Sequence, residues 1–328
     1  MTDVIGVDLG GTKIAVARLV GRELADAKLS PTNLDSAEAL IDQLVSLVQD
    51  CRGAELDGVG IGVPSVVNFE KGRVVSSVNI PLVDVPLGEV LGERLGVPVF
   101  VDNDATVAAL AEAHDDDLKM VARDLVMLTI GTGVGGGLVL DGRIYRGATG
   151  GAGELGHTLV GMDLRGPVPA AGKFPQSGSL ESVAAGHALD GLVERFAREH
   201  PNSALGRRHA AGEKLTGVEA AEAALDGDPD AARLIELWGE RVGIGVANAI
   251  NTFDPKEVVI GGGAARAGDL LLEPAKRTAS AYVLPGLGTD TTIRLARHGV
   301  QAGVLGAALL AVHELSRVDS PSPTEVVR

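Results

Sequence analysis

Two glycine-rich turns, each between two apolar runs, constrain the fold of this chain more than any other feature. The first interrupts residues 4–17, where β-branched residues stop at Gly10 and Gly11 and then resume. The second interrupts residues 125–140, which hold five glycines between positions 131 and 137. Two such strand–turn–strand units, about 120 residues apart, predict a duplicated architecture of two lobes with a cleft between them, across which each turn presents backbone N–H groups.

The composition excludes several classes of function. The 328 residues, 45% of them hydrophobic, are enough for two lobes with real cores. A net charge of −15 repels a phosphate backbone, and one Trp, two Tyr and five Phe offer few stacking platforms, so we expect no nucleic-acid partner. Cys51 is the only cysteine, which rules out an intramolecular disulfide and fits a reducing compartment. Because residues 1–5 lack signal-peptide features and no run of eighteen uncharged apolar residues occurs, we expect a cytoplasmic protein without membrane contact.

Both turns suit the binding of phosphate groups. In the first, Asp8 ends an apolar run and precedes Gly10, Gly11, Thr12 and Lys13. Glycine lets the backbone approach phosphate oxygens, and Asp8 is placed to hold Mg²⁺ directly or through water. A tight β-hairpin is the simpler interpretation of the first turn alone, but the second turn has more glycines than a hairpin requires. The two together favour a nucleotide site, although neither matches a Walker A loop or the strand-to-helix fingerprint of dinucleotide sites.

Two further segments carry polar groups or glycines at the end of an apolar run. Asp102, Asn103 and Asp104 follow residues 99–101 and precede a helical pattern over residues 105–113. Asp104 is placed to accept a proton from a substrate hydroxyl that Asn103 orients, while capping of the helix by Asp102 or Asp104 is the structural alternative. Residues 256–264 are predicted to form a strand that ends in three glycines. These glycines would allow the backbone to approach a flat adenine closely, and an ordinary strand-to-helix turn is the structural alternative.

The other patterns indicate helices and the limits of the lobes. Helical spacing predicts helices over residues 36–48, 228–250 and 300–315, the last with small residues suited to close packing. The polar stretch 199–214 is predicted to be a surface loop. We expect an N-terminal lobe of residues 1–115 joined by the helix 300–316, a C-terminal lobe of residues 116–299, and a flexible tail at 317–328.

In the order and spacing of these motifs, the chain resembles the ROK family of sugar kinases from Val4 to about Leu315. The resemblance implies an α/β protein of the actin-like/hexokinase ATPase fold, with two lobes of duplicated βββαβα type. It makes Asp104 the catalytic base. It further implies nucleotide binding by Asp8, Gly10, Gly11, Thr12, Lys13, Thr132, Gly133, Gly135, Gly261, Gly262 and Gly263. The same resemblance implies that the sugar is bound by Ser65, Asn79, Asn103, Asp104, Glu154, His157 and Glu181.

The chain departs from the family at its zinc site, which is built from one histidine and three cysteines. His157 matches the histidine, but the cysteine positions fall at Gly172, Phe174 and Ser179. Since zinc needs four ligands, we expect no zinc site, and apolar packing of Phe174 with Val168, Pro169 and Pro175 in its place. A looser loop that holds the substrate less tightly is the alternative. A second departure is Ser65, where the family tends to have glycine, and its bulk is expected to reshape the sugar pocket.

The resemblance implies an ATP- and Mg²⁺-dependent kinase that phosphorylates a hexose hydroxyl, giving the 6-phosphate as in glucokinases. Alternative substrates are an amino sugar, such as kanosamine or an N-acetylhexosamine, or a C7 cyclitol. A sugar-sensing repressor needs an N-terminal winged helix, whereas this chain enters its first strand at Val4. The intact Asp8, Asp104 and glycine turns argue against a pseudokinase, and the acidic composition argues against polyphosphate as donor. The resemblance implies a homodimer or homotetramer.

Overall fold

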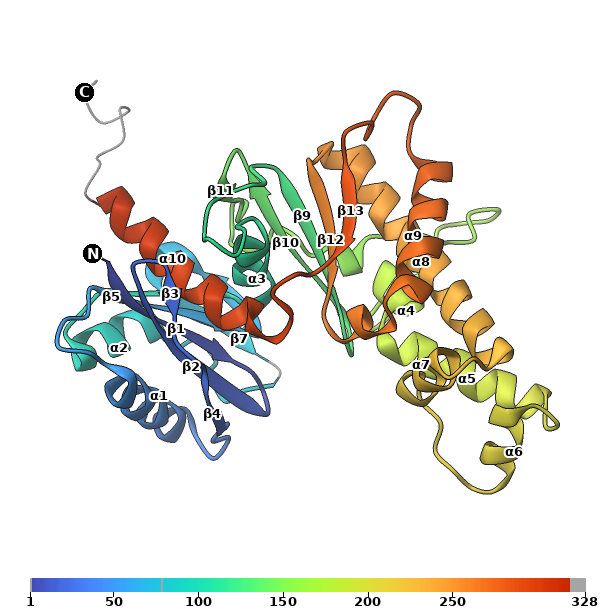
Figure 1. The fold of residues 1–328 in the computed structure, drawn as a ribbon, viewed down its shortest axis with the longest axis horizontal. Coiled ribbons are helices and arrows are strands. Elements are labelled where there is room, and N and C mark those ends of the chain that lie inside the picture. Colours follow the sequence, from blue (N-terminus) through green and yellow to red (C-terminus); the bar gives the residue numbers. More distant parts are fainter. Residues whose placement is uncertain (1, 78, 319–328) are drawn as a thin grey trace. The chain divides into compact units, whose positions relative to one another are not determined.

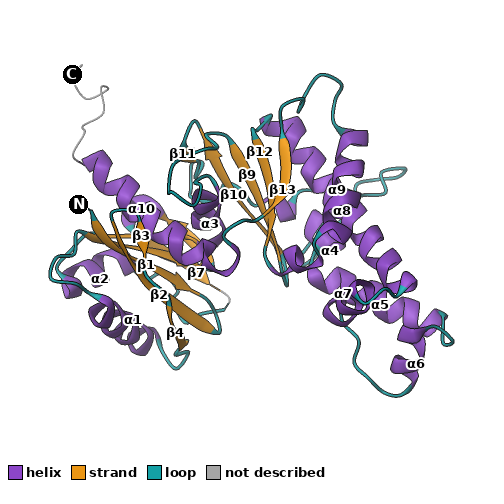
Figure 2. Ribbon diagram, viewed as in Figure 1, coloured by secondary structure: helices purple, strands orange, loops and turns teal. Residues whose placement is uncertain are grey.

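The computed structural model describes residues 2–77 and 79–318 (Figure 1). The chain divides into two compact units, and each is described by itself. Unit 1 comprises Met1–Arg123, Gly137–Gly153 and His298–Arg328, and unit 2 comprises Asp124–Gly136 and Glu154–Arg297. Both units combine strands with helices (Figure 2). The chain is therefore an α/β protein, as the sequence predicts.

Unit 1 is built on a six-stranded sheet in which β3, β2, β1, β5 and β8 follow one another and β4 pairs with β2. β1 is antiparallel to β2 and parallel to β5, which in turn is parallel to β8. β1 and β5 are buried almost throughout, as expected for central strands that are covered on both faces. The strands are β1 (Asp3–Leu9), β2 (Lys13–Val20), β3 (Glu23–Leu24), β4 (Lys28–Pro31), β5 (Gly58–Val63) and β8 (Val99–Asn103).

Helices α1 (Ala37–Cys51) and α2 (Leu87–Leu95) pack beside this sheet. Ser36 caps α1 by accepting a hydrogen bond from the N–H of Ala39, so the predicted start of this helix is confirmed. The apolar face of α1 belongs to the same buried cluster as β1 and β5. Between β5 and β8 the chain also forms a small hairpin of β6 (Ser65–Asn68) and β7 (Arg73–Ser77), joined by the 3₁₀ turn η1 (Phe69–Lys71).

Helix α10 (Ala302–Val318) packs on β1, β5 and α3 (Asp104–Glu112) at very short range. A Cβ at Gly6 or Gly60 would overlap a carbonyl oxygen of α10, and one at Gly306 would overlap the carbonyl oxygen of Val107. Only glycine permits such an approach, which confirms that the small residues of this segment serve close packing. Gly299–Arg317 is the one described stretch long and apolar enough to span a membrane, but half of it is buried in the protein, as in a core helix.

The second sheet repeats the strand order of the first. Its strands follow the order β11, β10, β9, β12 and β13, with β12 parallel to β9 and to β13. Each sheet thus has a meander of three strands extended on one side by two parallel strands, and the predicted duplication is confirmed. The strands are β9 (Leu125–Ile130), β10 (Val134–Leu140), β11 (Arg143–Ile144), β12 (Glu257–Gly261) and β13 (Thr292–Leu295).

Long helices make up the rest of unit 2. α8 begins after Asp228, whose carboxylate caps it, with Pro229 in the first turn as predicted. It packs along α9 and also contacts α4, α5 and α7. The helices are α4 (Leu180–Ala184), α5 (Gly186–Glu199), α6 (Ala204–Ala210), α7 (Gly217–Leu225), α8 (Pro229–Phe253) and α9 (Asp269–Tyr282), with the 3₁₀ turns η2 (Leu155–His157) and η3 (Gly263–Ala267). The turn η4 (Gly299–Gln301) precedes α10 in unit 1.

Several local predictions need correction. The cap of α3 is Asn103 and neither of the flanking aspartates, because β8 runs through Asn103 and Asp104 is already the first helical residue. The stretch predicted as a loop at 199–214 contains α6, which Ser203 caps through the N–H of Gly206. Of the predicted tail at 317–328, residues 317 and 318 belong to α10, and 319–328 lie outside the described residues.

The compact units also differ from the predicted lobes. Gly137–Gly153 groups with unit 1, whereas the sequence prediction assigns it to the C-terminal lobe. The reason is local packing, since a Cβ at Gly137 would lie only 2.5 Å from the carbonyl oxygen of Ala105, and β11 contacts α3. The lobe boundaries at 115 and 300 remain predictions.

Unit 1 contains a histidine pair that makes its stability sensitive to acid. The rings of His114 and His313 meet edge to face at 5.3 Å, and burial, with the neighbouring His114, lowers the pKa of His313 to about 4. Between pH 6.5 and pH 4 the unfolded chain therefore binds a proton that the folded protein does not, so stability falls as the pH falls. We expect His313→Leu to remove about 2–3 kcal/mol of this acid-induced loss, measured by urea unfolding at pH 7.5 and pH 4.

The control is His200→Leu, which replaces an exposed histidine of unit 2. It should leave the difference in unfolding free energy between the two pH values unchanged. An equal acid-induced loss in wild type and His313→Leu would contradict the assignment.

Candidate active site

The parallel strands of unit 1 bring three predicted segments to one edge of the sheet. Asp8 in β1 pairs with Gly62 in β5, and Gly62 pairs with Asp102 in β8. Since neighbouring strands lie about 4.8 Å apart, the backbone at Asp8 and Asp102 is separated by about 10 Å. Asp104 follows two residues after Asp102, so the first glycine turn and the Asp102–Asp104 triplet lie at the same edge, as predicted for cleft chemistry in α/β proteins.

The first glycine turn is held by hydrogen bonds within its own backbone and from Thr32. The N–H of Gly10 donates to the carbonyl of Lys13 at 3.0 Å, and the Thr32 hydroxyl donates to the carbonyl of Gly10 at 2.7 Å. A Cβ at Gly11 would stand 3.1 Å from the Cβ of Asn79, so the predicted sugar-binding asparagine lies beside this turn. The side chains of Thr12 and Lys13 are exposed, as ligand-facing groups should be.

The Asp8 carboxylate meets the criteria for a cation ligand. It lies against Gly303 of α10, where any side chain would overlap it. Burial raises the pKa of Asp8, an effect that the charge of Lys13 partly offsets. Within the described residues Asp8 makes no hydrogen bond or ion pair, so its desolvated charge is left for a ligand. A divalent cation would stabilise such a carboxylate, which fits the predicted role in holding Mg²⁺.

Asn103 organises the start of α3 around Asp104. Its side-chain oxygen accepts hydrogen bonds from the N–H groups of Ala105 and Thr106, and its amide donates to the carbonyl of Ser65 at 3.3 Å. The capping role and the predicted substrate role thus fall on the same residue. The hydroxyl of Ser65 is buried and has no hydrogen-bond partner among the described residues, so a polar ligand group would satisfy it.

In unit 2, Val134 joins the second glycine turn to the sugar motif. Its N–H donates to Oε2 of Glu181 at 2.8 Å, while a Cβ at Gly156 would overlap its carbonyl oxygen. A Cβ at Gly133 would also overlap the Glu181 carboxylate. The predicted glutamate at the start of α4 therefore closes over the glycine turn, and η2, which carries His157, packs on the other side of the same residue. Gly135 lies in β10, one residue further on.

The other residues of the predicted sugar motif remain accessible. Glu154 precedes η2, and its Oε2 lies 3.7 Å from Nε2 of His157. The His157 ring meets the edge of Phe174 at 5.2 Å between centroids. Both polar side chains are more than one-third exposed, so their hydrogen-bonding atoms are free to meet a sugar hydroxyl.

The segment 168–179, for which the sequence predicts apolar packing in place of a zinc site, is held differently from that prediction. Phe174 and Val168 are 73% and 72% exposed, so apolar burial does not order it. Instead, the N–H of Val160 donates to the carbonyl of Gly178, and the Gln176 side chain bonds both backbone groups of Gly172 at 2.8 Å. Among the described residues, no group of three or more His, Cys, Asp or Glu side chains is arranged to hold a metal.

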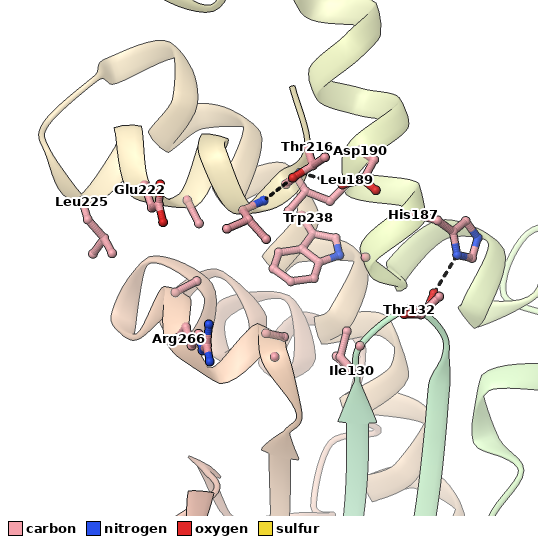
Figure 3. A pocket seen from close by; sticks show the side chains of 18 residues that line it. Ile130, Thr132, His187, Leu189, Asp190, Thr216, Glu222, Leu225, Trp238 and Arg266 are labelled. Atoms are coloured by element: carbon pink, nitrogen blue, oxygen red, sulfur yellow. Dashed lines mark hydrogen bonds between the residues drawn. The ribbon is translucent and has the colours of Figure 1, made fainter. Parts of the chain in front are cut away.

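A pocket of about 430 Å³ adjoins the second glycine turn within unit 2 (Figure 3). Its volume is in the range of small-ligand sites, and its lining is mostly apolar. In Figure 3, Thr132 and His187 lie at one end and Leu225, Glu222 and Arg266 at the other. His187 Nδ1 lies 2.8 Å from the carbonyl oxygen of Thr132, which fixes the ring against the turn.

Most of the pocket comes from residues that sequence reasoning missed. They belong to the N-terminal half of α5, to α7 and its cap, to η3 and to α8, namely His187, Asp190, Thr216, Glu222, Arg266 and Trp238. A signal for one wall was present, because Thr216 and Glu219 form a capping box at the start of α7. The remaining walls come together only through tertiary packing, which single-sequence periodicity does not report.

The predicted adenosine glycines divide into distinct roles. Gly261 ends β12 in register with Thr129 of β9. Gly262 has a φ of 77°, and a Cβ there would lie 2.5 Å from the carbonyl oxygen of Ile130. Gly263 begins η3 and lines the pocket, with no heavy atom within 4 Å of a Cβ placed on it. The triple-glycine exit thus allows close packing at Gly262 and leaves open space at Gly263.

Comparisons with known proteins match the chain over nearly its whole length. The model of the ROK family matches residues 4–314. A glucokinase of Halalkalibacterium halodurans is 34% identical over 98% of both chains. Among solved structures, a ROK hexokinase from Thermus thermophilus has a TM-score of 0.76 at 33% identity, covering 96% of this chain and 99% of that one. A ROK glucokinase from Streptomyces griseus, in complex with glucose and AMPPNP, has a TM-score of 0.75 at 29% identity, covering 95% and 99%.

Neighbouring glycines provide a matched test of the η3 entrance. Gly262→Ala combines a positive φ with a backbone clash, so it should lower the free energy of unfolding by about 1–3 kcal/mol. Gly263→Ala meets open space and should change it by no more than about 0.5 kcal/mol. Urea unfolding of both variants beside wild type measures the difference. Equal stability of the two variants would show that the close packing on Ile130 is not as described.

Proposed function

Because the chain belongs to the ROK family, we propose that it transfers the γ-phosphoryl group of ATP to a hydroxyl of a hexose. The predicted family and the actin-like/hexokinase ATPase fold are confirmed by the family match and by the solved ROK kinases. The predicted enzyme class, an ATP-dependent sugar kinase, is supported by the similarity to a glucokinase and by the likeness to a glucokinase solved with glucose and AMPPNP.

One observation carries the proposal for unit 1, namely the register of Asp8, Gly62 and Asp102 across three parallel strands. It sets the backbone of Asp8, whose carboxylate is suited to a cation, about 10 Å from the backbone of Asp102 in the triplet that ends in Asp104. This separation leaves room for a phosphoryl group and an attacking hydroxyl between the two. Gly62 contributes by having no side chain, since a Cβ would press on Val107 of α3 and lie 3.5 Å from the Cα of Asp104.

In the proposed reaction, the oxygen of the sugar hydroxyl bonds to the γ-phosphorus, and Asp104 accepts the proton of that hydroxyl. The bond between that phosphorus and the bridging oxygen of ADP breaks, and the leaving oxygen takes the electron pair. The transition state is loose, so positioning and charge neutralisation contribute more than the strength of the base. Asn103 holds the first turn of α3 in place and thereby the Asp104 carboxylate.

The glycine turns supply groups for the phosphate charge. In the first turn, the exposed Lys13 and the backbone are suited to binding phosphate oxygens. In the second turn, Thr132 and Gly133 are suited to the same role. Asp8 would hold Mg²⁺, which when bound neutralises phosphate charge. The pocket beside Thr132 is the proposed adenosine site, with the phosphates towards Thr132 and His187 and the base towards Leu225 and Arg266.

Glu154, His157 and Glu181 are proposed to hydrogen-bond the sugar hydroxyls, as are Asn79 and Asn103. Ser65 adds an unsatisfied buried hydroxyl next to Asn103, which favours a substrate with a polar group at that place. Glucose is the proposed substrate, with transfer to its 6-hydroxyl. Amino sugars and cyclitols are the alternatives that a substrate panel separates. A homodimer or homotetramer, a cytoplasmic location and the absence of nucleic-acid partners remain predictions.

The test is a coupled ADP-release assay with Mg-ATP on glucose, N-acetylhexosamines, kanosamine and C7 cyclitols. We expect turnover with glucose, and a loss of about two or more orders of magnitude in kcat in Asp104→Asn and Asp104→Ala with the fold retained. Asp269→Asn is the matched control, because Asp269 is likewise the first residue of a helix but is exposed on α9. No activity on any substrate would refute the kinase proposal, and near-normal transfer by Asp104→Ala would refute the role of Asp104.

The zinc-free segment gives a separate prediction. Purified protein should contain substoichiometric zinc even after expression with added zinc, because within residues 2–77 and 79–318 His157 has no set of partner ligands. A zinc-selective chelator at constant Mg²⁺ should leave kcat and the unfolding midpoint unchanged. Elemental analysis is the measurement, and one zinc per chain or inactivation by the chelator would contradict the prediction.

A further inference from the structure

We propose that Arg146 is the positioning residue of the phosphoryl transfer, holding the Asp102–Asp104 triplet so that the Asp104 carboxylate stays aligned. This inference rests on the proposed function, because it takes Asp104 as the proton acceptor. Arg146 follows β11 and belongs to unit 1, as do all its partners. None of the motifs found in the sequence includes it.

The guanidinium group of Arg146 is held by two carboxylates at its edges and by an aromatic ring on one face. Its Nε donates to Oδ2 of Asp102 at 2.7 Å, and one Nη donates to Oε1 of Glu314 at 3.1 Å. Its Cζ lies 3.4 Å from the centroid of the Phe69 ring, a cation–π contact. The side chain is only 15% exposed, so three elements of unit 1 (β8, η1 and α10) hold it against one another.

From Asp102, hydrogen bonds lead through Asn103 to the first turn of α3, which holds the proposed base. The Asp102 side chain is 3% exposed, and its Oδ1 accepts a hydrogen bond from the N–H of Asn103 at 2.9 Å. Asn103 in turn caps the first turn of α3, in which Asp104 is the first residue. Burial raises the pKa of Asp102, and the charge of Arg146 opposes that shift. Without the guanidinium, Asp102 would take up a proton or turn towards water, and either change would disturb the bond to Asn103.

The same arginine also restrains the chain that leads into the sugar motif. Its carbonyl oxygen accepts a hydrogen bond from the N–H of Ala152 at 3.1 Å. A Cβ at Gly150 would overlap the carbonyl oxygen of Val67, so this segment lies tightly against the β6–β7 hairpin. Glu154 follows two residues after Ala152. A shift of Arg146 would therefore reach both the triplet and the approach to Glu154.

A pocket gives small ions access to this arginine. It has a volume of about 190 Å³ and is lined by Arg146 together with Arg143, His313, Glu314 and Arg317. Arg143 and Arg317 are exposed, so the pocket communicates with solvent. Truncation of Arg146 to alanine would join the vacated volume to this pocket, and a free guanidinium ion could then pair with Asp102 and Glu314.

The experiment measures steady-state kinetics of Arg146→Ala and Arg146→Lys with Mg-ATP and the substrate of wild type. We expect kcat of Arg146→Ala to fall about 10- to 100-fold, with KM for ATP nearly unchanged, since Arg146 does not line the nucleotide pocket. Arg146→Lys should recover only part of kcat, because an ammonium lacks the planar fork and the stacking on Phe69. Guanidinium chloride at roughly tens of millimolar, far below denaturing concentrations, should restore kcat of Arg146→Ala, whereas equal sodium chloride should not.

Arg317→Lys is the matched control, because Arg317 also pairs with Glu314 but is 58% exposed and does not touch Asp102. It should keep wild-type kcat. The Asp104→Asn variant should gain nothing from guanidinium, which separates rescue of alignment from general activation. Hydrogen exchange of the peptide spanning residues 101–107 gives a readout independent of activity, and exchange there should be faster in Arg146→Ala than in Arg317→Lys.

A purely structural role for Arg146 would give a lower unfolding midpoint with wild-type kcat in the folded fraction, and that result would overturn the inference. So would loss of kcat without rescue by guanidinium, if hydrogen exchange at residues 101–107 stayed as in wild type. A wild-type enzyme without kinase activity refutes the proposed function instead, and the hydrogen-exchange comparison still tests whether Arg146 orders the triplet.

Discussion

The parallel main-chain hydrogen bonds that join β1, β5 and β8 determine where the chemistry of unit 1 lies. They set Asp8, Gly62 and Asp102 side by side at the carboxyl ends of the strands. A one-residue slip of β8 would turn Asp102 to the opposite face of the sheet and separate it from Arg146. Helix α10 packs directly on the glycines of β1 and β5. It approaches so closely that no larger residue fits at Gly6 or Gly60, and this packing supports the register.

That edge carries two carboxylates, Asp102 buried and Asp8 half-buried, whose surroundings differ. Burial raises the pKa of both Asp8 and Asp102. Asp102 has its own cation, since Arg146 bonds it directly, which stabilises its charge permanently. Asp8 has only the more distant Lys13, whose charge lowers its pKa in part. A carboxylate that is paired with an arginine of the same protein is suited to a structural role. A carboxylate whose charge is only partly balanced is suited to reversible binding of a cation, such as one that arrives with a nucleotide.

The sequence predicted the local features well, because strands, turns and helix starts depend on neighbouring residues. The glycine turns, the cap of α1 at Ser36 and the start of α8 at Asp228 are of this kind. Asn103 was predicted to orient the substrate, but its capping role escaped prediction because all three residues of the triplet are suited to capping, and only the extent of β8 decides which one does so. Arg146 escaped because its partner Asp102 is 44 residues away. The lining of the proposed nucleotide pocket is likewise assembled from separate helices, so a local pattern such as the capping box of α7 indicates one wall and not the whole pocket.

The three positions at which the family's zinc cysteines are predicted to fall, Gly172, Phe174 and Ser179, each make separate local contacts. Ser179 is fully buried and caps α4 through the N–H of Ser182, which fixes the helix that begins with Leu180 and Glu181. Phe174 supports the His157 ring from its edge, and Gly172 accepts and donates hydrogen bonds with Gln176. The parts nearest the proposed sugar residues, at Ser179 and His157, remain ordered by these contacts, while the tip of the loop, with Val168 exposed, contributes little to the core.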